Sequence, residues 1–141
     1  MAKDYADRLT IAATFGAAGA VVSLIVGFFM FSEGGASAVA LQMLLATLAA
    51  TLSGFIFAKL VLRSTVSGAM IAGVLVPVLA QLVYSILLWV VNGIVGWNND
   101  PFLTYVIAFF GIGLILMGCI SLPVGIVIGL WLRKRLVGRA I

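Results

Sequence analysis

Four long apolar segments separated by short polar breaks dominate the pattern of hydrophobic and polar positions along the chain. They cover residues 9–31, 38–62, 67–95 and 102–132. A helix needs about 20 predominantly apolar residues to cross the ~30 Å hydrocarbon core of a bilayer, and each segment reaches that length. The pattern therefore predicts an all-α fold: an integral membrane bundle of four transmembrane helices, forming one membrane domain over residues 1–141. The last two segments exceed the required length, so we expect them to tilt, bend or project.

Turn-forming residues mark the breaks between the segments. The first break contains residues 32–35, and Ser37 is placed to cap the second helix. The last break ends with Asp100 as the expected N-cap and Pro101 at the first helical position, where proline is favoured. Only residues 63–66 separate the second and third segments. So short a connection predicts that these two helices are antiparallel neighbours.

Every basic residue lies at the same side of the four predicted spans. The eight are Lys3, Arg8, Lys59, Arg63, Arg133, Lys134, Arg135 and Arg139. The two opposite breaks carry only Glu33 and Asp100. Lys and Arg accumulate in cytoplasmic loops, so both termini are predicted to be cytoplasmic, in a bacterial-type inner membrane. The net charge of +4 then indicates contact between the basic C-terminus and anionic lipid headgroups, not nucleic acid.

A cleaved signal peptide is the alternative interpretation of the first segment. Residues 36–38 have the small side chains of a cleavage site. The hydrophobic region of a signal peptide is about 7–15 residues long, and this segment is longer. Asp4 and Asp7 also dilute the positive charge that should precede such a region. The favoured interpretation is therefore that the first segment is a transmembrane span, which makes four spans in total.

The composition excludes most kinds of chemistry. The chain is 65% hydrophobic and only 9% charged, and it contains no histidine. The predicted spans hold no Asp, Glu, His or Arg, and Lys59 is near enough to a helix end to reach the headgroups. General acid–base catalysis needs titratable groups. We therefore expect no enzymatic activity, no cofactor, and no catalytic, cofactor-binding or metal-ligating residue.

Small residues recur at helical spacing on the second and fourth segments. They are Ala46, Ala50, Gly54 and Ala58 on the second, and Gly111, Gly118, Gly125 and Gly129 on the fourth. Such residues allow close approach of helices in lipid. Packing within the bundle explains them most simply. The functional alternative is a docking face for another membrane protein or for a second copy of the chain.

Two prolines interrupt the third and fourth segments at similar predicted depth. Pro77 and Pro123 each leave a backbone carbonyl without its helical donor. If these helices touch, those carbonyls and the side chains of Gln81 and Ser121 define a candidate polar site near the membrane midplane. The simpler interpretation is that the prolines only bend their helices.

Gln81 is the side chain most expected to form a hydrogen bond between helices, because a glutamine in hydrocarbon needs a partner. The candidate partners are Thr47, Thr51 and Ser121. Two functions follow from the pattern as a whole. The first is a non-catalytic accessory or assembly subunit that packs against other membrane proteins or against itself. The alternative is a small channel, flippase or exporter with its pathway near the third and fourth helices.

Overall fold

The fold is entirely helical in the part of the chain that the computed structural model describes, which is residues 2–30, 35–63, 65–96 and 101–137. The helices are α1 (Ala2–Met30), α2 (Gly35–Arg63), α3 (Val66–Val95) and α4 (Phe102–Leu136). Each of these four helices is long and apolar enough to cross a membrane. The predicted all-α fold of four span-length helices is thus confirmed.

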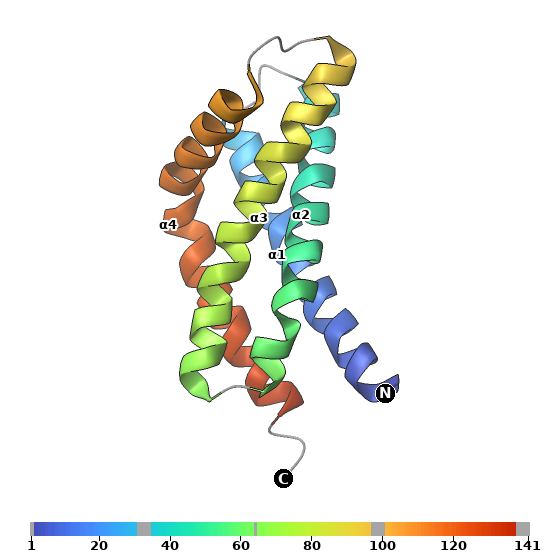
Figure 1. The fold of residues 1–141 in the computed structure, drawn as a ribbon, viewed down its shortest axis with the longest axis vertical. Coiled ribbons are helices and arrows are strands. Elements are labelled where there is room, and N and C mark those ends of the chain that lie inside the picture. The colour runs from blue at the N-terminus through green and yellow to red at the C-terminus, as the bar shows by residue number, and fades with distance from the viewer. Residues whose placement is uncertain (1, 31–34, 64, 97–100, 138–141) are drawn as a thin grey trace.

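The helices are arranged as two hairpins that lie side by side. The start of α1, the end of α2, the start of α3 and the end of α4 lie at one end of the bundle, and the other four helix ends lie at the opposite end (Figure 1). α1 packs along α2, α3 packs along α4, and α2 joins the hairpins through extensive contact with α3. The antiparallel α2–α3 pair predicted from the short connection is confirmed. By contrast, α1 and α4 touch only slightly.

Two helices extend beyond the apolar segments that predicted them. α1 begins at Ala2 instead of residue 9. In its first turns the carboxylate of Asp4 forms an ion pair with Arg8, four residues later, with 3.0 Å between Oδ2 and Nη2. α4 continues to Leu136 instead of residue 132. Hydropathy marks the part of a helix that fits hydrocarbon, whereas pairs of opposite charge spaced four residues apart also support a polar helical turn.

The predicted caps of α2 and α4 are wrong in position. α2 begins at Gly35, so Ser37 lies inside its first turn and cannot cap it. Pro101 is the N-cap of α4, not its first helical residue, because its ψ of 134° is extended. The break after α3 does begin as predicted, at Gly96, whose left-handed φ of 76° ends the helix. Asp100, Glu33, Arg139 and residues 32–34 lie outside the described residues.

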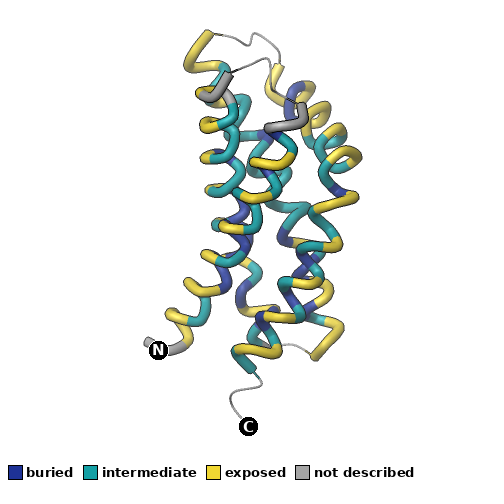
Figure 2. The backbone as a smooth tube through the Cα atoms, turned by 180° about the vertical axis from the view of Figure 1, so that it is seen from behind, coloured by how far each residue is buried: buried dark blue, intermediate teal, exposed yellow. Residues whose placement is uncertain are grey.

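The tightest core lies in the half of the bundle that holds the chain ends. Its buried members are Ile11, Phe15, Ala58, Val61, Ala72, Val76 and Leu132, contributed by all four helices. Buried positions face the interior there, while exposed positions line the outside (Figure 2). The outer surface carries large apolar side chains such as Ile94, Ile115 and Leu103, which are 80%, 74% and 67% exposed. This surface matches hydrocarbon far better than water.

Candidate functional site

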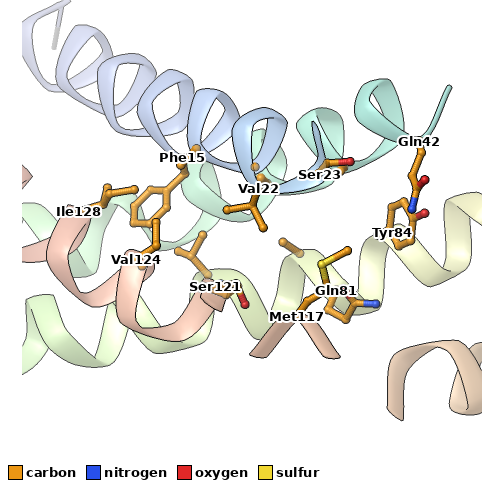
Figure 3. Close-up of a pocket in the computed structure, with 18 residues that line it drawn as sticks. Phe15, Val22, Ser23, Gln42, Gln81, Tyr84, Met117, Ser121, Val124 and Ile128 are labelled. Atoms are coloured by element: carbon orange, nitrogen blue, oxygen red, sulfur yellow. The ribbon is translucent and has the colours of Figure 1, made fainter. Parts of the chain in front are cut away.

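A cavity of about 100 Å³ lies between the two hairpins, directly above the buried core (Figure 3). Side chains from all four helices line it, and Phe15 and Val76 belong both to the core and to the cavity wall. The polar lining residues are Ser23 from α1, Gln42 from α2, Gln81 and Tyr84 from α3, and Ser121 from α4. None of the described lining residues is an Asp, Glu, Lys or Arg.

The polar and apolar parts of the lining are separated along the bundle axis. Figure 3 shows Ser23, Gln42 and Tyr84 gathered at one end, with Phe15 and Ile128 at the other. The apolar end is the one nearer the core and the chain ends. The cavity is therefore amphipathic, with hydrogen-bonding groups at one end and hydrocarbon at the other.

Ser23 has a buried hydroxyl that differs from several other hydroxyls of the bundle. Its side chain is 3% exposed, and its Oγ has no hydrogen-bond partner among the described residues. Hydroxyls in helices commonly donate to the carbonyl one turn back, and those of Thr10, Thr14, Thr47, Thr51, Ser53 and Ser85 all do so. An unsatisfied buried polar group costs about 1–3 kcal/mol. Ser23 lines the cavity, so its hydroxyl is an unsatisfied hydrogen-bonding group in the cavity wall.

Gln81 joins α3 to α4 through a backbone carbonyl. Its Nε2 donates to the carbonyl oxygen of Phe109 over 3.3 Å, which confirms the predicted bond between helices. The predicted partners are wrong, because Thr47 and Thr51 donate to carbonyls of their own helix. Gly113 explains the choice: it lies one turn beyond Phe109, and a Cβ there would collide with the Gln81 amide. The amide reaches the Phe109 carbonyl because Gly113 has no side chain.

Gln42 and Tyr84 form a second polar contact at the cavity, between α2 and α3. Their side chains are hydrogen-bonded to each other. Further along the bundle, Asn92 Nδ2 donates to the hydroxyl of Tyr105 over 2.7 Å and links α3 to α4. Sequence reasoning missed Gln42 and Ser23. Gln42 could have been found in the sequence because it is an amide side chain within an apolar segment, as Gln81 is. Both glutamines of the chain line the cavity.

Three of the four residues in the candidate midplane site line the cavity, and one does not. Pro77, Gln81 and Ser121 belong to its wall, whereas Pro123 is exposed on the outside of α4. Pro77 has no N–H to donate to the carbonyl of Gly73. That carbonyl faces Gly125 of α4, where an added Cβ would collide with it and would lie 2.7 Å from Cγ of Pro77. The backbones of α3 and α4 therefore meet closely at the cavity wall.

Most of the predicted packing faces contact a neighbouring helix of the same bundle. On α2, Ala46, Ala50 and Gly54 lie against α1, and Ala58 belongs to the core. On α4, Gly125 and Gly129 lie against α3. Gly111 has nothing within 4 Å of where a Cβ would be, and the nearest atom for Gly118 belongs to Leu122 of its own helix. These last two glycines do not face another described helix.

Comparisons with family models, with curated proteins and with solved structures gave no match. The fold and the cavity therefore define the protein by class: an all-α bundle of four span-length apolar helices, consistent with a small membrane protein. A partly open, amphipathic cavity lies between its two hairpins, and none of the described lining residues carries a formal charge.

Proposed function

We propose that the protein is a multi-pass protein of a bacterial-type cytoplasmic membrane, with both termini in the cytoplasm. The span-length helices and their apolar outer surface support insertion. The described basic residues Arg8, Lys59 and Arg133–Arg135 lie on helix ends near the chain termini and the α2–α3 connection, and lysine and arginine favour the cytoplasmic side. The C-terminal group is positioned to meet anionic headgroups.

Within that membrane, we propose that the protein binds a small uncharged molecule between its two hairpins and passes it across the bilayer, as a small channel, flippase or exporter. The observation that carries this proposal is the cavity itself, whose wall includes Ser23 with a buried hydroxyl that has no partner among the described residues. Intramembrane sites for transported molecules lie between such repeats or bundles, where irregular backbone is tolerated. In the cavity wall, Pro77 leaves the carbonyl of Gly73 without its helical donor, while α3 continues as one helix through it.

The accessory-subunit hypothesis rested on the small-residue faces of α2 and α4. Because six of those eight residues are used inside the bundle, their presence no longer requires an outside partner. Docking onto another membrane protein or onto a second copy stays a prediction. The proposal of a small channel, flippase or exporter has the more direct support, because helix packing alone does not require a cavity.

Flux through reconstituted protein tests the proposed function. Proteoliposomes should accelerate glycerol efflux, or the flipping of a fluorescent glucosyl lipid whose headgroup is uncharged, relative to protein-free liposomes. Gln81→Leu should reduce the faster of these rates roughly fivefold, the effect of one hydrogen bond of about 1 kcal/mol. It removes the amide that lines the cavity and joins α3 to α4.

The two prolines provide a matched control. Pro77→Ala changes the cavity wall and should alter the rate, whereas Pro123→Ala makes the same chemical change on the exposed side of α4 and should not. The proposal fails if neither probe moves faster than in protein-free liposomes, or if both proline variants change the rate equally.

A further inference from the structure

Two hydrogen-bonding groups of the cavity wall are available to a ligand: the hydroxyl of Ser23, which is unused among the described residues, and the amide of Gln81, which is used only in part. Ser23 Oγ can donate one hydrogen bond and accept two, and it makes none with a described residue. Gln81 donates through Nε2, and its Oε1 accepts no hydrogen bond from a described residue. A ligand hydroxyl is both donor and acceptor, so it can pair with either group. A ligand carbonyl can only accept, and would leave the glutamine oxygen unused.

The lining also limits the charge of the ligand. No described lining residue is an acid or a base. A charged group moved from water into such a site would lose its hydration without gaining a counter-ion, which is strongly unfavourable. The ligand that fits is therefore uncharged.

The volume and the axial separation of the lining define the ligand's shape. A 150 Å³ apolar cavity holds the six carbon atoms of benzene, so a cavity of about 100 Å³ holds roughly four heavy atoms. Because the cavity is partly open, a longer chain can extend beyond it. With the hydroxyl near Ser23, the apolar body would extend toward Phe15, Val124 and Ile128 (Figure 3). These residues supply an aromatic ring and branched aliphatic side chains, which suit an aliphatic chain or a ring.

We propose that the cavity binds an uncharged alcohol, with its hydroxyl hydrogen-bonded to Ser23 and its hydrocarbon part in the apolar end. This inference rests on the proposed function and names the chemical class of its substrate. A free short-chain alcohol and the hydroxyl end of a longer lipid alcohol share this chemistry. The two are distinguished by their chain length in the experiment.

Photolabelling of the full-length protein in lipid nanodiscs tests the assignment. The probe is an octanol that carries a diazirine, and labelled positions are mapped by mass spectrometry. We expect saturable labelling within residues 15–23 and 117–128, the lining segments of α1 and α4. Hexanol at matched membrane concentration should compete, and hexane should not. Stronger competition by farnesol identifies a lipid alcohol, and stronger competition by hexanol identifies a free one.

Ser23→Ala should lower the affinity for the probe roughly tenfold, the effect of one buried hydrogen bond. Thr14→Ala is the matched control, because it removes another hydroxyl of α1 that lies outside the cavity and is bonded to Thr10. The thermal stability of Ser23→Ala should not fall, since the lost hydroxyl has no described protein partner. A lower stability together with weaker labelling would show a structural role and overturn the assignment.

The remaining outcomes separate this inference from the proposed function. Equal competition by hexane, or unchanged labelling of Ser23→Ala, would overturn the alcohol assignment while leaving a cavity that binds other uncharged molecules. An absence of saturable labelling, with flux still accelerated in proteoliposomes, would show that only water pairs with Ser23. An absence of both would overturn the proposed function as well.

Discussion

At the residue scale, the contact between Gln81 and the Phe109 carbonyl depends on the absence of a side chain at Gly113. The need of Gln81 for a partner on another helix could be predicted from its type alone, because an amide in an apolar segment must be satisfied. The partner could not be predicted, because it is a backbone carbonyl, and every residue has one. Ser23 was missed for a related reason: a helical serine ordinarily satisfies itself, and nothing in its neighbours signals that this one does not.

A double-mutant cycle tests the dependence of Gln81 on Gly113. Gln81→Leu and Gly113→Ala should each weaken the α3–α4 contact by about 0.6–1.7 kcal/mol, the range for hydrogen bonds between membrane helices. Each variant breaks the same contact, since the added Cβ displaces the amide. The double variant should therefore lose less free energy of unfolding than the sum of the two, measured by denaturant titration in mixed micelles. Strictly additive losses would show that the two residues act independently.

At the element scale, the spacing of small residues identified a face of α4 but not the part of it that meets α3. Gly111 and Gly125 share that face because they are separated by two seven-residue steps, yet of these two only Gly125 lies against the backbone of α3. Where two helix backbones come close depends on how the helices cross, and a one-dimensional pattern does not contain that angle. Helix ends were equally hard to predict, because the turns at Asp4 and beyond residue 132 are polar and still helical.

Gly125→Ala and Gly111→Ala form a matched pair for this contact. The Cβ added at Gly125 would meet the carbonyl of Gly73 and the ring of Pro77, so α3 and α4 must separate. Overpacking of this kind typically costs about 1–3 kcal/mol. Gly111→Ala meets open space and should be neutral or stabilising by up to about 1 kcal/mol, because alanine favours the helix.

Thermal unfolding of the two purified variants in detergent measures the difference. A Gly111 variant as unstable as the Gly125 variant would contradict the close approach of the two backbones at the cavity wall. Equal stability of Gly125→Ala and the unmodified protein would contradict it as well.

At the scale of the whole molecule, the number of helices and the antiparallel α2–α3 pair could be predicted, because each depends on runs of apolar residues and on the length of a connection. The cavity could be predicted only in part, through Pro77, Gln81 and Ser121 of the candidate midplane site. Its polar lining comes from Ser23, Gln42, Gln81, Tyr84 and Ser121. No local pattern joins positions that lie so far apart in the sequence and on four different helices.

The proposed orientation gives a prediction at the same scale. Alkaline phosphatase fused after residue 34 or residue 98 should be active, because both positions are expected outside the cytoplasm. Green fluorescent protein fused after residue 64 or at the C-terminus should fluoresce, because α2 and α4 both end at the side of the bundle that carries the described basic residues. An active phosphatase at residue 64, or a fluorescent fusion at residue 34, would reverse the orientation.

The slight contact between α1 and α4 has a consequence for how a guest molecule could reach the interior. Of the pairs of helices that follow each other around the bundle, this one shares the least surface, so parting it breaks the fewest interactions. The seam faces sideways, toward the acyl chains of a surrounding bilayer, and both helices that border it also line the cavity. A hydrophobic alcohol dissolved in the lipid would then enter the cavity laterally between α1 and α4, without first passing through water on either side of the membrane.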